Sequence, residues 1–223
     1  MRLNHFLATA GIASRRAADK LIEAGQVKVN GQVTKAMGTQ VDPASDVVEV
    51  AGQIIQLEHV KVTYLLNKPA GVVTTASDPD GKKTVLDLVP AEPRVFPCGR
   101  LDAATIGLVV LTNDGDLCYS LTHPKFEVQK EYILEGHCQN PQAAVANLLA
   151  GVRLKDGSAK ADAVTVLKAS GNQVSLGVTI HDGRNRIIRR MCEAVGIDLV
   201  VLTRTKMGDF ELGDIPSGEY KLV

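Results

Sequence analysis

The first 50 residues change from a helical to an alternating pattern of hydrophobic positions. Apolar residues recur every three to four positions in two stretches, which predicts two short helices built on Leu3, Phe6, Leu7 and Ala10 and on Ala17, Leu21 and Ile22. The first helix should stop at Gly11, and the second should begin at Ser14, a capping residue, and end at Gly25. Valines then alternate around Asn30-Gly31, a dipeptide typical of a tight hairpin, and residues 47–50 offer another strand. The sequence therefore predicts two helices followed by a small sheet.

The remainder of the chain alternates short β-like runs with helical segments. Strands are expected at residues 62–66, 72–75, 108–111, 132–135, 163–167 and 174–180, and helices at 141–150 and 185–195. The run at 108–111 is wholly apolar, which predicts a fully buried strand. We expect an α+β fold with a mainly antiparallel, mixed sheet flanked by helices. A polar stretch near 58–61 indicates a short linker between a domain at 1–58 and a larger one at 62–223.

Composition narrows the class of protein. The chain has 223 residues, of which 45% are hydrophobic, enough for a substantial core. No apolar run approaches the roughly 18 residues that a membrane-spanning helix needs, and the first residues lack the apolar centre of a signal peptide, so we expect a cytoplasmic protein that does not contact a membrane. The four cysteines are dispersed without a Cys-x-x-Cys pair, and the sequence therefore predicts neither a disulfide framework nor a metal site.

Charge is distributed unevenly although the formal net charge is zero. Basic residues gather in two clusters, which are Arg2, Arg15, Arg16, Lys20, Lys28 and Lys35 in the first and Arg184, Arg186, Arg189, Arg190, Arg204 and Lys206 in the second. Screening over about 8 to 10 Å makes local charge matter more than the total. Two basic clusters on a neutral chain fit phosphate contacts at two places, although solvated helix faces would give the same pattern.

One carboxylate stands out as a candidate for chemistry. Asp102 lies two residues after Arg100 and between Gly99 and Gly107, glycines placed where a chain turns tightly or admits another backbone. An ordinary surface ion pair between Arg100 and Asp102 is the simpler alternative. However, the run Gly-Arg-Leu-Asp-x-x-Thr-x-Gly-Leu, followed by Leu-Thr-Asn-Asp-Gly, resembles the catalytic motif of bacterial ribosomal RNA pseudouridine synthases.

Further segments extend this resemblance over residues 2–222. Residues 2–31 are similar to an RNA-binding domain of the ribosomal protein S-four type, and Leu-Asn-Lys-Pro-Ala-Gly at 66–71 resembles an element at the head of the family's catalytic sheet. Lys-Glu-Tyr at 130–132 resembles its Lys-x-Tyr element, and Gly-Arg-Asn-Arg-Ile-Ile-Arg-Arg-Met at 183–191 resembles its arginine-rich helix. Ile187 stands where the family usually has glutamine.

The resemblance implies an isomerase that converts uridine to pseudouridine in ribosomal RNA without a cofactor. Asp102 would be the catalytic carboxylate, acting through a covalent adduct or as a base on the sugar. Arg189 would orient and ionise it, and Tyr132 would stack on the target base. His123 and His181 match no catalytic position, and we expect both to be structural. The expected RNA contacts are Arg2, Ser14, Arg15, Arg16, Lys28, Lys68, Arg100, Lys130, Arg184, Arg186 and Arg190.

The partner is expected to be ribosomal RNA or a ribosomal assembly intermediate, bound by a monomer during ribosome biogenesis. Residues 74–75, 84–87 and 213–220 favour the large-subunit branch of the family over the small-subunit branch, which remains the alternative. A second alternative is a non-catalytic RNA-binding assembly factor. A metal-dependent nuclease would need clustered carboxylates and histidines, and Asp114 and Asp116 are too isolated for that.

Overall fold

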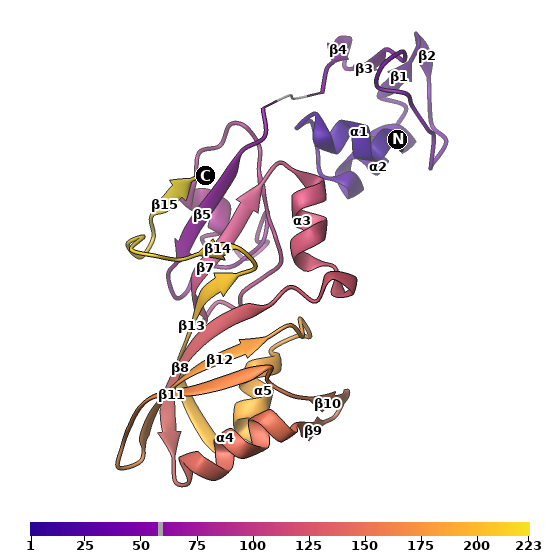
Figure 1. The fold of residues 1–223 in the computed structure, drawn as a ribbon. Helices are drawn as coiled ribbons and strands as arrows, with labels where there is room; N and C mark the ends of the chain where they lie inside the picture. Colours follow the sequence, from indigo (N-terminus) through magenta and orange to yellow (C-terminus); the bar gives the residue numbers. More distant parts are fainter. Residues whose placement is uncertain (58–59) are drawn as a thin grey trace. The chain divides into compact units, whose positions relative to one another are not determined.

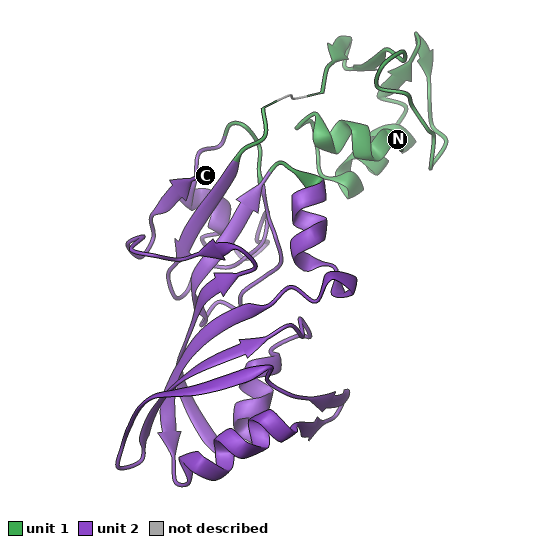
Figure 2. Cartoon of the chain, viewed as in Figure 1, with its two compact units in different colours: residues 1–62, 92–95, 113–115 green, residues 63–91, 96–112, 116–223 purple. Residues whose placement is uncertain are grey.

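The computed structural model describes residues 1–57 and 60–223, and the chain divides into two compact units. Unit 1 consists of residues 1–62 with two short loops, 92–95 and 113–115. Unit 2 consists of residues 63–91, 96–112 and 116–223 (Figure 2). The expected domain end at residue 58 lies outside the described residues. No helix in the described part of the chain has the length and apolar character needed to cross a membrane.

Unit 1 contains the two predicted helices and a four-stranded antiparallel sheet. Helix α1 spans Leu3–Thr9 and α2 spans Arg15–Glu23, and the sheet has the order β2-β1-β3-β4, with β1 at Val27–Val29, β2 at Gln32–Val33, β3 at Val48–Val50 and β4 at Gln53–Ile55. The Ser14 hydroxyl accepts a hydrogen bond from the Ala17 backbone N–H, as expected for a cap. Asn30 and Gly31 have φ values of 51° and 79°, the left-handed angles of a tight hairpin. The predicted order of elements is confirmed.

Unit 2 is built on a mixed sheet of nine strands (Figure 1). Its main order is β11-β12-β8-β13-β7-β5-β15, with β14 paired to β13 and β6 to β7. The strands are β5 (Thr63–Lys68), β6 (Phe96–Pro97), β7 (Ile106–Thr112), β8 (Lys130–Cys138), β11 (Ala163–Ser170), β12 (Gln173–Ile180), β13 (Ile197–Met207), β14 (Phe210–Glu211) and β15 (Tyr220–Leu222). Of these pairings, β13 with β7 is parallel and the others are antiparallel. The predicted mainly antiparallel, mixed sheet is confirmed.

Helices cover one face of this sheet. Helix α4 (Pro141–Ala150) and helix α5 (Ile187–Ala194) contribute Leu148 and Met191 to a core that also contains Leu134, Leu176 and Leu202 from β8, β12 and β13. The remaining elements are α3 (Gly115–Thr122), two 3₁₀ turns at Val85–Leu88 and Pro124–Phe126, and a separate hairpin of β9 (Val152–Leu154) and β10 (Gly157–Ala159). The core therefore fixes α5, with its arginines, against β8 and β13.

Four features of the structure differ from the sequence expectations. Residues 72–75 form no strand, because the Thr74 hydroxyl bonds to the Leu101 backbone and only an isolated bridge from Val73 to Thr84 remains. Helix α5 starts at Ile187 rather than 185, because Arg186 has a φ of 50°, outside the helical region. Strand β13 was not predicted, although its first half contains an apolar run at 199–202, because threonines and charged residues follow at 203–206. Helix α3 was not predicted either, because Asn113-Asp114-Gly115 favours a turn.

The parallel contact between β13 and β7 joins two halves of the sheet through only two residue pairs, Thr203 with Ile106 and Arg204 with Gly107. Gly107 has a φ of 97°, and a Cβ atom there would overlap the carbonyl oxygen and the amide nitrogen of Arg204. Glycine is therefore required for both its backbone angle and the close approach of the two strands. The loop that carries Asp102 leads directly into this junction.

Candidate active site

A cavity of about 430 Å³ opens at this junction within unit 2. Its lining comes from the loop before β7, the segment leading into α5, and the facing strands β8 and β13. The cavity brings together all three predicted catalytic residues and several predicted RNA contacts, which are Asp102, Tyr132, Arg189, Arg100, Lys130, Arg184 and Arg186. Positive side chains outnumber carboxylates on this wall, since only Asp102 and Asp182 contribute negative charge to it.

Asp102 lies at the start of a tight turn. The Thr105 backbone N–H donates to the Asp102 carbonyl at 3.0 Å, which closes the turn over Ala103 and Ala104. The Asp102 side chain remains 31% exposed, and its Oδ2 lies 3.8 Å from both Arg189 Nε and Arg186 Nη1. These distances give electrostatic attraction without a hydrogen bond, so the carboxylate has two positive side chains beside it and remains accessible. The ion pairs seen in the described part of the chain join Asp102 to these two arginines, not to Arg100.

Arg189 is fixed by a second contact in the same turn. Its Nη2 donates to the Thr105 hydroxyl at 3.0 Å, and Thr105 is itself buried. Its Nε is buried and has no hydrogen-bond partner among the described residues. The guanidinium is therefore anchored at one end and leaves a donor free beside the carboxylate.

Lys68 requires a correction. Sequence analysis predicts it as an RNA contact, but its side chain is completely buried, with an exposed fraction of 0%. Its Nζ donates to the carbonyl oxygens of Pro69, Val72 and Ala103 at 2.9, 2.8 and 3.2 Å. Burial lowers the pKa of Lys68 to about 8, and the charge of Asp102 opposes this shift. Lys68 therefore supports the turn of Asp102 from inside the protein and does not reach RNA.

The segment after β5 holds the Asp102 loop at two more points. Gly71 N–H donates to the Ala103 carbonyl at 2.9 Å, so this oxygen receives bonds from both Gly71 and Lys68. The Thr74 hydroxyl donates to the Leu101 carbonyl at 2.9 Å and accepts from the Leu101 N–H at 3.2 Å. Sequence reasoning did not identify Thr74 as a site residue. Its signals were its proximity to the Asn-Lys-Pro element and its place in a segment that favours the large-subunit branch.

Strands β8 and β13 form the opposite wall. Tyr132 pairs across the strands with Arg204, and both line the cavity together with Lys130. Lys130 Nζ donates to the carbonyls of Val128 and His181 at 2.8 and 3.2 Å. Arg204 was predicted as part of a surface cluster, but it is only 2% exposed, and its Nε donates to the Leu108 carbonyl at 2.8 Å. The partly buried ring of Tyr132 is placed to form one side of a base pocket.

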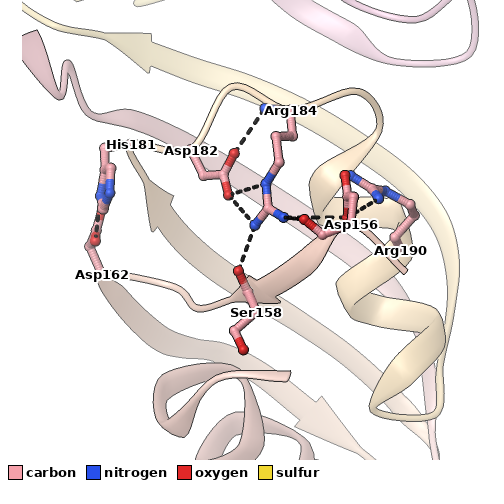
Figure 3. A network of polar contacts seen from close by, with 7 residues as sticks. All are labelled: Asp156, Ser158, Asp162, His181, Asp182, Arg184 and Arg190. Atoms are coloured by element: carbon pink, nitrogen blue, oxygen red, sulfur yellow. Dashed lines mark hydrogen bonds and ion pairs between the residues drawn. The ribbon is translucent and has the colours of Figure 1, made fainter. Parts of the chain in front are cut away.

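Arg184, which lines the cavity, and Arg190, which does not, both form bonds within the protein (Figure 3). Arg184 donates to the Asp182 carboxylate through Nε and Nη2 at 2.8 and 2.6 Å, and it also bonds to the carbonyls of Asp156 and Ser158 in the β9–β10 hairpin. Arg190 Nη1 donates to Asp156 at 2.7 Å, which holds the pKa of this carboxyl below its usual value. Both arginines, predicted as phosphate contacts, therefore fasten the hairpin to α5.

A histidine–carboxylate pair lies beside this network. His181 Nδ1 is 2.8 Å from both carboxylate oxygens of Asp162 (Figure 3). The backbone carbonyl of His181 accepts a hydrogen bond from Lys130. The His181–Asp162 pair therefore stabilises the chain directly after the end of β12, where this carbonyl lies. His181 is absent from the cavity lining, which is consistent with a structural part.

The remaining predicted contacts lie in unit 1, at or near helix starts and on β1. Arg2 and Ser14 precede α1 and α2, and Arg15 and Arg16 are exposed in the first turn of α2. Lys28 lies on β1, with its Nζ 3.8 Å from the Glu49 carboxylate. An exposed helix start that carries two arginines is a suitable place for a phosphate.

Comparison with known proteins gives a consistent picture. Residues 62–194 match the family described as RNA pseudouridylate synthase, and residues 1–48 match the S4 domain. An RNA pseudouridine synthase of Aquifex aeolicus is 39% identical over 223 residues, covering 99% of this chain and 89% of that protein. The ribosomal large subunit pseudouridine synthase B of Bacillus subtilis is 40% identical over 224 residues, covering 99% and 91%.

Two further matches extend the comparison. The ribosomal large subunit pseudouridine synthase B of Vibrio cholerae is 36% identical, covering 98% of this chain and 70% of that protein. A crystal structure of a pseudouridylate synthase superimposes with a TM-score of 0.68 at 28% identity, covering 100% of this chain and 96% of the other.

Proposed function

Because this chain belongs to the RNA pseudouridylate synthase family, we propose that it isomerises a specific uridine of large-subunit ribosomal RNA, with Asp102 as the catalytic carboxylate. The observation that carries the assignment of the site is the position of Asp102. It is an accessible carboxylate 3.8 Å from two arginines in a cavity of about 430 Å³, a size typical of ligand pockets.

The reaction breaks the bond between N1 of uracil and C1′ of ribose and joins C5 of the same base to C1′. An ionised carboxylate at C1′ can add covalently to the sugar, or it can act as a base on it, and either route divides a difficult step into easier ones. Arg189 places a positive charge beside the Asp102 carboxylate and holds the turn in place through Thr105. Neither route requires a cofactor.

Extrusion of the target base explains the proposed roles of Tyr132 and of the positive side chains that line the cavity. The target nucleotide must leave its stack to reach Asp102, at a cost of a few kcal/mol. Stacking on an aromatic ring returns about 1–3 kcal/mol, and Tyr132 offers such a ring in the cavity wall. Arg100 and Arg186 line the same cavity and supply positive charge for the flanking phosphates or the displaced base.

Unit 1 is proposed to capture the RNA. Its exposed arginines at the start of α2 suit backbone phosphate, which gives affinity without acting on the base. The large-subunit target is supported by the relatives from Bacillus subtilis and Vibrio cholerae, whose names specify that subunit. The cytoplasm, where ribosomal RNA of bacteria is made, is the proposed location.

The deciding experiment maps pseudouridine at nucleotide resolution after incubation of the protein with separate large- and small-subunit ribosomal RNA transcripts. We expect a single new pseudouridine in the large-subunit RNA, and none with the Asp102→Asn variant. Conversion confined to small-subunit RNA would overturn the choice of target. Binding without conversion of either RNA or of partly assembled subunits would instead favour a non-catalytic assembly factor.

A further inference from the structure

Arg204 is a buried cation whose hydrogen-bonding capacity is only partly used. Its side chain is 2% exposed, and its Nε donates to the Leu108 carbonyl at 2.8 Å. Its Nη2 is buried and finds no hydrogen-bond partner among residues 1–57 and 60–223. A guanidinium keeps its charge at any physiological pH, and buried donors in native proteins are almost always paired. Since Arg204 lines the cavity, the missing partner is expected to be a ligand.

Lys130 adds a second positive charge on the same wall. It lies on β8 two residues from Tyr132, the cross-strand partner of Arg204, so all three side chains share one face of the sheet. Burial lowers the pKa of Lys130 and the charge of Arg204 lowers it further, whereas the charges of Asp182 and Asp162 oppose this shift. Lys130 uses two donors on backbone carbonyls and has a third to offer.

No carboxylate in the described part of the chain forms an ion pair with Arg204 or Lys130. The two acidic side chains in the cavity wall are engaged elsewhere, Asp102 with Arg186 and Arg189, and Asp182 with Arg184. The cavity wall around Arg204 and Lys130 therefore carries more positive than negative side chains, with Arg204 buried and Lys130 partly buried. Such a setting strengthens the interaction with an anion.

We propose that Arg204 and Lys130 stabilise the negative charge on the uracil base while it is detached from the ribose. This inference rests on the proposed function. When the N1–C1′ bond breaks, its electron pair stays on the base, and the charge spreads over N1, O2 and O4. The base returns to neutrality when C5 bonds to C1′, the C5 proton leaves and N1 gains a proton. No oxidant or reductant is needed.

The proposal holds for both routes open to Asp102. If the carboxylate bonds to C1′, or if it removes a proton from C2′, the base leaves as the same anion. Tyr132, which is directly opposite Arg204 in the strand pairing, is the proposed stacking surface, so a stacked base lies next to the Arg204 guanidinium. A backbone phosphate is a poorer candidate, because it stays solvated whereas Arg204 is buried in the cavity wall.

The test compares two leaving groups in single-turnover reactions at saturating RNA. Target RNAs carry either uridine or 5-fluorouridine at the modified position, and consumption of that nucleoside is followed by mass spectrometry. Fluorine withdraws electrons and stabilises the base anion without the help of the protein. For Arg204→Gln and Lys130→Met we expect about a 100- to 1000-fold loss of rate on uridine, and a loss about tenfold smaller on 5-fluorouridine.

The variants need controls for folding and for RNA binding. Arg204→Lys keeps the charge and should recover part of the rate, and Lys168→Met removes an exposed lysine of β11 outside the cavity and should change both rates by less than about twofold. If the Arg204→Gln variant does not fold, Lys130→Met is used alone, because Lys130 is only partly buried and its replacement disturbs the core less.

Two outcomes overturn the proposal. Equal losses on both bases would mean that the residues act only through packing. Weaker RNA binding with a reduced salt dependence and an unchanged single-turnover rate would make them phosphate contacts. Conversion of uridine by the wild-type protein is measured first, and it tests the proposed function by itself. The leaving-group comparison then asks only how the rate loss of each variant differs between uridine and 5-fluorouridine.

Discussion

Arg189 contacts both ends of one four-residue turn. Its Nη2 bonds to the Thr105 hydroxyl at 3.0 Å, and its Nε lies 3.8 Å from the Asp102 carboxylate. Because the Thr105 N–H also bonds to the Asp102 carbonyl, the arginine, the carboxylate and the turn form one closed unit. Disturbing any member should therefore change the position of the carboxylate.

Asp102→Asn keeps the size of the side chain and removes its charge. If Asp102 is the nucleophile or base, pseudouridine formation should fall below detection, while RNA affinity stays within a few fold of wild type because the phosphate contacts are untouched. Nucleotide-resolution mapping and filter-binding measurements check the two parts. Turnover close to that of wild type would rule out the assignment.

Arg189→Leu removes the cation and the bond to Thr105 while keeping much of the apolar bulk. We expect the single-turnover rate at saturating RNA to fall by at least about 100-fold, with little change in RNA affinity. Thr105→Val is the matched control, because it removes only the hydroxyl, and it should cause a smaller loss. A defect in affinity alone would identify Arg189 as a phosphate contact.

Lys68→Met tests the buried lysine through the pH dependence of stability. The pKa is about 8 in the folded protein and 10.5 in the reference state, so the unfolded chain holds this proton more tightly. The free energy of unfolding should therefore rise with pH between about 8 and 10.5, by up to about 3 kcal/mol from this group.

Denaturant unfolding of wild type and Lys68→Met across this range isolates the contribution of the lysine from that of other titrating groups. The variant also loses three hydrogen bonds, so its absolute stability is not compared with that of wild type. The quantity compared is the slope of the free energy of unfolding against pH. Parallel slopes for the two proteins would show that the folded-state pKa of Lys68 is not lowered.

Replacing Arg15 and Arg16 together by alanine tests the capture of RNA by unit 1. Each lost phosphate contact should lower the slope of log affinity against log salt by roughly 0.7 to 0.9 units, while the single-turnover rate at saturating RNA stays near that of wild type. Lys168→Ala, at an exposed position outside both basic clusters, is the control for loss of charge alone. An unchanged salt slope with slower conversion would mean that unit 1 positions the RNA for reaction.

Sequence patterns predicted elements whose signals are local. Helices α1, α2 and α4 follow apolar spacing and capping residues, and the hairpin after β1 follows from Asn30-Gly31, all of which depend on near neighbours in the chain. Strand β13 was missed although residues 199–202 form an apolar run, because threonines and charged residues occupy the four positions that follow. Its burial depends on pairing with β7 and β8, which are distant in sequence.

The difference between local signals and long-range contacts also explains which residues of the site were predicted correctly. Asp102, Tyr132 and Arg189 were found through motifs, and the cavity brings them together. Lys68 and Arg204 were placed at the surface because cations usually lie there. Their burial depends on carbonyl oxygens of Ala103 and Leu108, which are 35 and 96 residues away, and no local pattern reports such partners.

The narrow parallel contact between β13 and β7, with Gly107 in it, sets how the two halves of the sheet are placed relative to each other. On one side of this contact is the loop of Asp102, and on the other are Tyr132 and the strand of Arg204. With only two residue pairs across it, a small rotation of one half of the sheet against the other would change the separation between the carboxylate and the base pocket. Gly107→Ala would wedge these halves apart, so we expect it to impair alignment for the reaction even where both halves remain folded.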